Sequence, residues 1–178
     1  MIEKDHQSDR ENSGFKLDKK KKSNTTVSQS FTVNEIRDKL AKYCAYQDRC
    51  HWEVENKMRE FNLIPEAYEE ILIYLIQNDF LNEDRFARSF VRGKFNQKNW
   101  GRIKIRVELK KRRIPSKMIE SALGEIDEED YFKTLQKLFE KKKESLKNDR
   151  ESFKKKAKIR NYLLQKGFES EIIAELFR

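Results

Sequence analysis

The chain has 178 residues and a formal net charge of +9. Charged residues make up 40% of it, hydrophobic residues only 37%, and the mean hydropathy is −0.98, so a large apolar core is excluded. Five Gly and two Pro disfavour a turn-rich β architecture. The longest apolar run, Ile71 to Ile76, is far shorter than the ~20 residues of a membrane span, so we expect no membrane partner.

Residues 1–30 contain few apolar residues and the basic run Lys19 to Lys22, which predicts a disordered tail. They lack the apolar stretch of a signal peptide. The only cysteines, Cys44 and Cys50, fit a reducing compartment. The sequence therefore predicts a cytoplasmic protein.

From residue 31 onward one apolar pattern occurs three times. Its first copy begins at Trp52, its second at Ile103 and its third at Ala157. Such self-similarity indicates stacked repeats, each of which cannot bury its apolar face alone. We predict an all-α protein of three tandem three-helix units in an elongated, curved array, over residues 31–80, 81–126 and 127–178.

Within the first unit, the apolar spacing predicts helices over about 36–44, 52–61 and 65–79. The segment 71–76 could form a strand by itself, but its counterparts in the other copies lie in helical contexts. We therefore expect a helix there.

The second and third units carry clear helix signals. Asn82 is a good N-cap, Gly101 is expected to begin the second helix, and Pro115 the third. The third unit begins after the acidic cluster 127–130, and Gly167 is expected to end its second helix.

Charge is concentrated in the second unit. Residues 81–126 hold 13 basic and 5 acidic groups, a net charge of +8, whereas residues 31–80 have a net charge of −4 and residues 127–178 one of +3. A concentrated basic unit predicts a polyanion partner, with nucleic acid as the first candidate.

The basic groups of this unit form two helical stripes. One follows Gly101 and spans about 80° of the helix, and the other recurs at i, i+3 and i+7 on the preceding helix. Glu83, Asp84, Glu108 and neighbouring acidic helices could neutralise part of this charge. The predicted nucleic-acid or filament contacts are Arg85, Arg88, Arg92, Lys94, Lys98, Arg102, Arg106, Lys110, Lys111 and Arg113.

The unit offers little for reading base sequence. Specific duplex readers usually add Asn or Gln on a recognition helix. Phe95, Trp100 and Tyr131 could stack on bases, but each also fits a core or junction position, the interpretation that we favour. We therefore expect sequence-independent contact with the phosphate backbone.

Signals for an enzyme or a metal site are missing from the sequence. His6 lies in the tail and His51 at a helix junction, and Cys44, Cys50 and His51 match no familiar zinc spacing. No Gly-rich phosphate loop or nucleophile elbow occurs. We predict no catalytic residue, no metal and no cofactor.

Three segments resemble a known family. Residues 81–87 resemble the L-x-D-x-R-F-A signature of the RecX family of recombinase regulators. Residues 98–114 resemble its K-G-x-x-R-I-x-x-E-L-x-x-K-G-I segment, and residues 166–173 are similar to its K-G-F-x-x-x-x-I ending. The second unit has Arg112 and Arg113 where the family often has Lys-Gly, and the first unit has Phe61 and Asn62 there.

The resemblance implies three tandem three-helix units that modulate the RecA recombinase. Members of this family are thought to lie in the groove of the recombinase–DNA filament and to inhibit strand exchange, ATP hydrolysis and coprotease activity. It thus implies a non-enzymatic, monomeric regulator of DNA repair and recombination, whose partners are the RecA filament and DNA phosphates. A free-standing helix-turn-helix-like DNA-binding module is the alternative.

Overall fold

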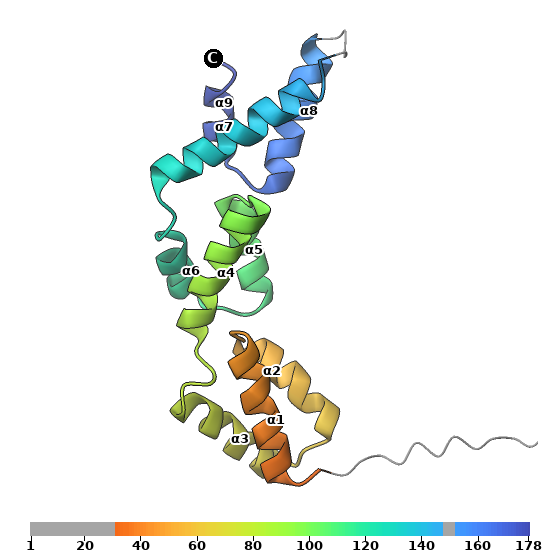
Figure 1. The fold of residues 1–178 in the computed structure, drawn as a ribbon, viewed down its shortest axis with the longest axis vertical. Helices are drawn as coiled ribbons and strands as arrows, with labels where there is room; N and C mark the ends of the chain where they lie inside the picture. The colour runs from red at the N-terminus through yellow and green to blue at the C-terminus, as the bar shows by residue number, and fades with distance from the viewer. Residues whose placement is uncertain (1–30, 148–151) are drawn as a thin grey trace, which may run out of the picture. The chain divides into compact units, whose positions relative to one another are not determined.

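The computed structural model describes residues 31–147 and 152–178. Within these ranges the chain forms nine α-helices and one 3₁₀ helix and no strand (Figure 1), which confirms the all-α prediction. None of the helices in the described ranges is long and apolar enough to span a membrane. The predicted disordered tail, residues 1–30, lies outside the described residues.

The first three helices are α1 (Val33–Tyr46), α2 (His51–Met58) and α3 (Pro65–Gln77), and the 3₁₀ helix η1 (Arg59–Phe61) extends α2. A capping box fixes the start of α1. The Thr32 side chain accepts a hydrogen bond from the Glu35 backbone amide, and the Glu35 carboxylate accepts one from the Thr32 backbone amide. Residues 71–76 are helical as predicted. Helix α1 packs against both α2 and α3.

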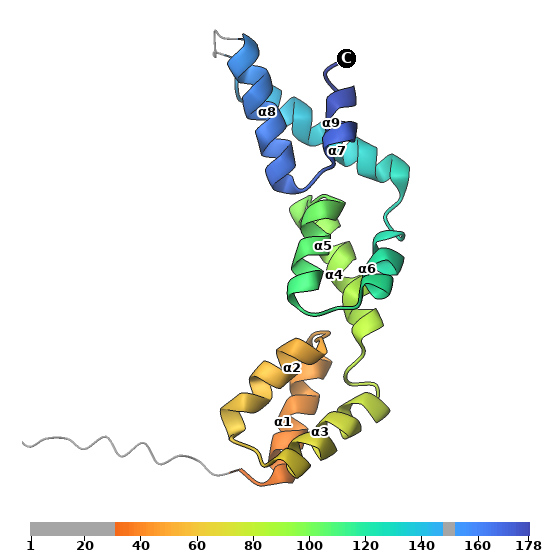
Figure 2. The same ribbon diagram turned by 180° about the vertical axis from the view of Figure 1, so that it is seen from behind.

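The next three helices are α4 (Glu83–Lys98), α5 (Arg102–Lys111) and α6 (Ser116–Leu123), and they pack against one another (Figure 2). Asn82 caps α4 as predicted, because its side-chain oxygen accepts from the Arg85 amide at 3.0 Å. Gly101 is the N-cap of α5 and Pro115 that of α6, so both helices begin where the sequence indicated.

The last three helices are α7 (Glu128–Glu144), α8 (Ser152–Lys166) and α9 (Ser170–Glu175), and α8 packs against α7 and α9. Asp127 caps α7 by accepting from the Asp130 amide at 2.9 Å. Gly167, with φ +92°, follows α8 as predicted.

A left-handed residue follows the second helix of each group. Asn62 has φ 52°, Arg113 φ 61° and Gly167 φ 92°, and the three occupy equivalent positions of the repeat. Arg113 therefore adopts the left-handed conformation even though the family glycine is missing there. Because three separate chain segments take the same uncommon conformation, the repeat seen in the sequence is a repeat in structure.

The buried side chains form two separate clusters rather than three. One cluster is built from α1, α2 and α3 with Leu81, and the other from α4 to α9 with Cys50. Tyr131 joins the second and third groups, with its ring centroid 5.8 Å from that of Phe95 and 5.1 Å from that of Phe168. The favoured core interpretation holds for Phe95 and Tyr131, which are both buried.

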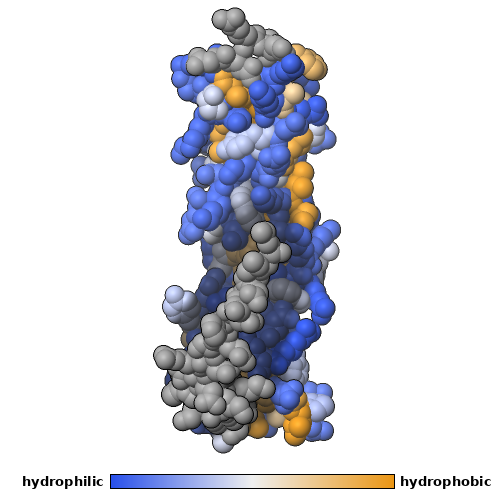
Figure 3. All heavy atoms as spheres, turned by 90° about the vertical axis from the view of Figure 1, so that its right-hand side faces the viewer, coloured by the Kyte–Doolittle hydropathy of each residue, from blue (hydrophilic) through white to orange (hydrophobic). Residues whose placement is uncertain are grey.

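The first position of the repeated apolar pattern lies at the surface in all three copies. Trp52 is 36% exposed, Ile103 is 42% exposed, and Ala157 is exposed as well. The face drawn in Figure 3 is mainly hydrophilic and carries only small apolar patches. The helices thus bury thin stripes, as a chain with 37% hydrophobic residues requires.

Helix α5 begins against the end of α8. The Gly101 amide donates to the Lys166 carbonyl at 2.8 Å, and the Ile103 amide donates to the Gly167 carbonyl at 3.0 Å. The last carbonyls of α8 therefore satisfy amides at the start of α5 that have no partner within that helix. The chain turns from α4 into α5 at Asn99, Trp100 and Gly101, and this turn is also where the second and third groups meet.

The first and second groups meet through polar side chains. Asp48, after α1, accepts from Arg85 Nε at 2.8 Å and from the Ser89 hydroxyl at 2.7 Å. Arg112 Nε lies 3.4 Å from Glu53 Oε1. Burial raises the pKa of Asp48, but the hydrogen bonds from Ser89 and Arg85 outweigh it, and the net pKa is lowered.

Candidate nucleic-acid interface

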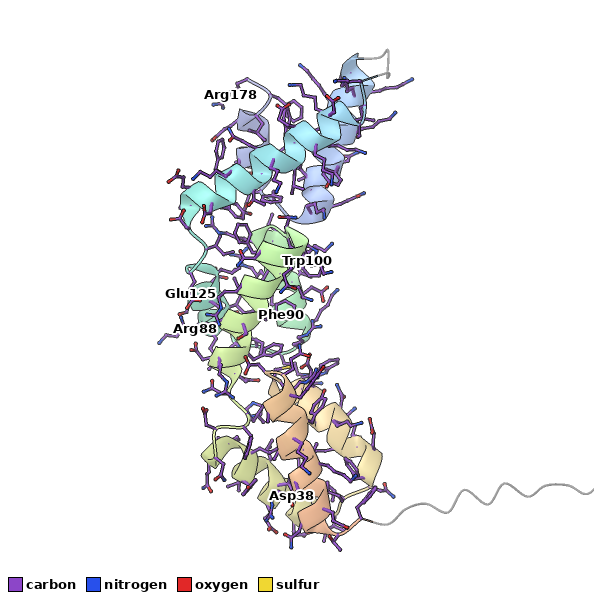
Figure 4. All side chains as sticks on the ribbon, viewed as in Figure 1. Asp38, Arg88, Phe90, Trp100, Glu125 and Arg178 are labelled. Carbon is purple, nitrogen blue, oxygen red and sulfur yellow. The ribbon has the colours of Figure 1, made fainter. Side chains whose placement is uncertain are left out.

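The predicted arginines of α4 are held in ion pairs. Arg85 binds Asp48 at 2.8 Å and Asp79 at 2.6 Å. Arg88 binds Asp84 at 2.7 Å and also pairs with Glu125, on the opposite side of α4 from Phe90 and Trp100 (Figure 4). Arg92 lies 3.4 Å from Glu125 as well.

The predicted arginines of α5 are paired too. Arg102 Nη2 lies 2.7 Å from Glu128 Oε1, and its guanidinium lies 4.2 Å from the centroid of the Tyr131 ring. Arg106 makes two 2.8 Å hydrogen bonds to Glu120, and this contact lowers the pKa of the Glu120 carboxyl. These arginines fasten α5 to α6 and to α7.

Four of the ten predicted residues lie in no ion pair within residues 31–147 and 152–178. Lys94 and Lys98 lie on α4, Lys110 on α5 and Arg113 in the turn after it, whereas Lys111 pairs with Glu108 at 2.7 Å. The alternative interpretation, in which acidic groups neutralise the basic stripes, therefore holds for the arginines of α4 and α5. It does not describe the lysines at the end of α4.

Two lysines, one from α4 and one from α5, lie beside an aromatic ring. Lys94 Nζ lies 5.3 Å from the Trp100 ring centroid, and Lys104 Nζ lies 4.6 Å from it. Lys166 Nζ donates to the Lys98 carbonyl at 3.3 Å and so adds a cation from α8. We call the group of Lys94, Lys98, Trp100, Lys104 and Lys166 the lysine–tryptophan face.

The joint between α5 and α8 positions this face. Lys104 Nζ donates to the Gln165 carbonyl at 3.3 Å, while Gly101 and Gly167 hold the two backbones together. Two ammonium groups thus lie within 5.3 Å of the centroid of one half-buried indole, and Lys98 and Lys166 add positive charge at the ends of α4 and α8, an arrangement suited to phosphates with an adjacent base or sugar. Sequence reasoning placed only Lys94 and Lys98 in the contact set, and it missed Lys104 and Lys166.

The cysteines offer no second chemistry. Cys44 and Cys50 are free and buried, and burial raises the pKa of each thiol to about 11. Among residues 31–147 and 152–178 no three His, Cys, Asp or Glu side chains gather as they would around a metal ion. The basic face is therefore the candidate site of this part of the chain.

The fold and this face define a helical repeat protein with a basic surface at the joint of its second and third units. The family model described as "RecX, second three-helix domain" matches residues 82–123, and "RecX, third three-helix domain" matches residues 128–177. The chain belongs to the RecX family.

Curated relatives support this assignment. Regulatory protein RecX of Serratia proteamaculans is 31% identical over 115 residues, which are 64% of this chain and 66% of that protein. The relative from Prosthecochloris aestuarii is 29% identical over 133 residues, 75% of this chain and 85% of its own. The chain spans only 54% of the relative from Oceanobacillus iheyensis, at 27% identity over 148 residues and 83% of this chain.

Two crystal structures have the same fold. RecX from Lactobacillus salivarius matches with a TM-score of 0.73 and 29% identity, over 82% of this chain and 94% of that one. A second structure of regulatory protein RecX matches with a TM-score of 0.70 and 26% identity, over 79% and 68% of the two chains.

Proposed function

We propose that this protein is a non-enzymatic cytoplasmic regulator that binds the filament of a RecA-type recombinase on DNA. It lowers the strand exchange, ATP hydrolysis and coprotease activity of that filament and so affects DNA repair and recombination. Membership of the RecX family, whose members are named regulatory proteins, supports the class. The lysine–tryptophan face is the single observation that supports the DNA contact.

The lysine–tryptophan face fits phosphates better than base edges. Each ammonium is a compact charge on a flexible stem, which follows a phosphate track without demanding a fixed geometry. Arginine reads guanine bidentately in specific complexes, but the predicted arginines of α4 and α5 are tied to carboxylates instead. Contact that is independent of sequence follows from this division.

The first unit has the opposite charge and serves a different surface. Residues 31–80 carry a net charge of −4, against +8 for residues 81–126. An acidic surface is repelled by DNA and attracted to basic protein surface. We propose that the first unit contacts the recombinase while the second unit faces the DNA phosphates.

The test reverses charge on the face and elsewhere by the same amount. One variant carries Lys94→Glu, Lys98→Glu and Lys104→Glu. Its matched control carries the same change at Lys42, Lys117 and Lys141 on α1, α6 and α7, outside the lysine–tryptophan face. Each variant is added to an active recombinase filament on single-stranded DNA, and ATPase and strand exchange are followed.

The wild type and the control should lower both rates at or below stoichiometric amounts, and the face variant should not. Circular dichroism checks that all three proteins remain helical. A wild-type protein that leaves both rates unchanged contradicts the proposed function. A face variant as inhibitory as the control would show that another surface meets the filament.

The three-helix form of the units also fits the alternative, a free-standing helix-turn-helix-like DNA-binding module. That module would bind naked duplex with sequence preference, and each wrong base pair would cost ~1–3 kcal/mol. Co-sedimentation with bare DNA, bare recombinase and the assembled filament separates the two functions. Preference for the filament supports the regulator, and tight sequence-dependent binding to bare duplex supports the alternative.

A further inference from the structure

A groove of about 280 Å³ lies beside the lysine–tryptophan face, with Gly93 of α4 on its wall. A Cβ atom built on Gly93 would meet nothing within 4 Å, and the residue does not have a positive φ. Glycine inside a helix lowers helix stability relative to alanine. Neither packing nor backbone conformation requires glycine here, and its consequence is an open groove.

The floor of the groove is aromatic. Phe86 is buried and Phe90 is half-buried, and their ring centroids lie 5.7 Å apart. The Arg112 guanidinium and Lys94 Nζ each lie 5.0 Å from the Phe90 centroid. The groove therefore offers an aromatic wall on which a planar group can stack when the flexible Lys94 side chain moves aside.

The rim of the groove is polar and basic. Gln47 and Gln97 line it, and their side-chain amides, each a donor and an acceptor, make no hydrogen bond to residues 31–147 or 152–178. Lys94 and Lys98, which belong to the lysine–tryptophan face, line the same groove. Asp48 lies there too, but its carboxylate is already bound by Ser89 and Arg85.

We propose that this groove receives one unstacked base of a single-stranded nucleic acid. The base stacks on Phe90 over Gly93, the amides of Gln47 and Gln97 bind its edge, and its phosphates lie on the lysine–tryptophan face. The proposal rests on the proposed function only in taking nucleic acid as the ligand of that face.

A single strand fits this groove and a duplex does not. Bases in a duplex are paired and stacked, and extruding one costs a few kcal/mol. A volume near 280 Å³ lies below the ~300–1,000 Å³ of ordinary ligand pockets, so it suits one ring system rather than a larger ligand. The combination of aromatic wall, amides and lysines is the one by which proteins hold single strands.

The test uses two fluorescent single strands of equal length and charge, one with all its bases and one with abasic sites. Stacking of one base gives the wild type a tighter affinity for the intact strand by about tenfold. Gly93→Leu fills the groove and should reduce the ratio of the affinity for the intact strand to that for the abasic strand to near one, while the abasic strand remains bound. Gln97→Leu, at an exposed position, should lower this ratio of affinities as well.

The matched control is Gly124→Leu at the end of α6, where a Cβ has ordinary contacts of 3.4 and 3.5 Å and the lining of the groove is not touched. It should keep the full ratio. Gly93→Ala should raise the melting temperature while it weakens discrimination, because it improves the helix and narrows the groove.

Equal affinity of the wild type for both strands overturns the proposal. So does a Gly93→Leu variant that loses affinity for both strands by the same factor, since it would then have damaged phosphate contact alone. The result of the filament assay does not depend on the result of this strand-binding assay. A protein that discriminates the strands but does not inhibit the filament keeps the groove and loses the proposed function.

Discussion

The contact between Gly101 and Gly167 is the tightest backbone approach among the glycines of residues 31–147 and 152–178, and Gly101→Ala is the change that tests it. A Cβ at Gly101 would lie 2.2 Å from the Gly167 carbonyl oxygen, 2.3 Å from its carbon and 2.5 Å from the Phe168 nitrogen. All three are backbone atoms of another helix end, so no side chain can swing away. Gly101 has φ −77°, which alanine adopts freely, so the whole effect is steric.

The expected cost follows from what the added methyl separates. Moving the start of α5 off the end of α8 breaks the hydrogen bonds from the Gly101 and Ile103 amides, which are 2.8 and 3.0 Å long. Each such bond contributes about 1 kcal/mol net, and looser packing around buried Phe168 adds a similar amount. We expect Gly101→Ala to lower the free energy of unfolding by about 2–4 kcal/mol.

Urea unfolding followed by far-UV circular dichroism measures this value, and fluorescence of Trp100, next to the substituted residue, reports the joint itself. Gly124→Ala is the matched control, because a Cβ there has its nearest contacts at 3.4 and 3.5 Å and φ is −65°. It should change stability by less than ~0.5 kcal/mol. If both alanine variants unfold at the same urea concentration, the interlocked joint does not exist in solution.

Three further predictions concern Tyr131, the Arg106–Glu120 ion pair and the two buried cysteines. Tyr131→Phe removes a buried hydroxyl that accepts from a backbone amide of α5 at 3.0 Å, and should cost about 1–2 kcal/mol in urea unfolding, where an unchanged midpoint would contradict the bond. Arg106→Gln removes the partner that lowers the pKa of Glu120. A carboxyl whose pKa is lower in the folded state than in the unfolded state stabilises the fold at pH values above its unfolded-state pKa. This stabilisation is lost as the pH falls through its folded-state pKa. The variant should therefore be less stable than the wild type by up to ~1 kcal/mol at pH 7, and the gap should close below about pH 4.5, the ordinary value for Glu. Cys44 and Cys50, with pKa values raised to about 11 by burial, should react with a thiol reagent only after unfolding, and labelling of the native protein at pH 7 would contradict their burial.

The repeat and the positions of the helices could be predicted because they depend on local signals. Asn82, Gly101 and Gly167 act through their own backbone segments, so their roles at helix ends can be read from neighbouring residues. The residues 71–76 by themselves fit either a strand or a helix, and only comparison with the equivalent segments of the other two copies predicts the helix that is observed. Periodicity therefore sufficed for the helices, and comparison between copies resolved the strand-like segment.

The candidate site could be predicted only in part, because ion pairing depends on distant partners. Arg85 binds Asp48, which lies in the first group, and Arg102 binds Glu128, which begins the third. Counting 13 basic against 5 acidic groups within residues 81–126 leaves these carboxylates out. Lys166 joins the face because α8 ends where α5 begins, which no spacing within the second unit can reveal.

Arginine and lysine side chains thus have different roles in the second, basic unit. A planar guanidinium satisfies two carboxylate oxygens at once, as Arg106 does on Glu120, and suits a joint between helices. Lys94, Lys98 and Lys110, with flexible single charges and no ion pair within residues 31–147 and 152–178, remain available at the surface. Neutralising Z phosphates of a single strand gives a salt slope of about −0.7Z. The four lysines of the lysine–tryptophan face therefore imply a slope near −3, whereas all ten residues predicted from the sequence would imply one near −7. A titration of strand affinity against salt decides between them, and a slope near −7 would mean that the arginines leave their carboxylates to bind DNA.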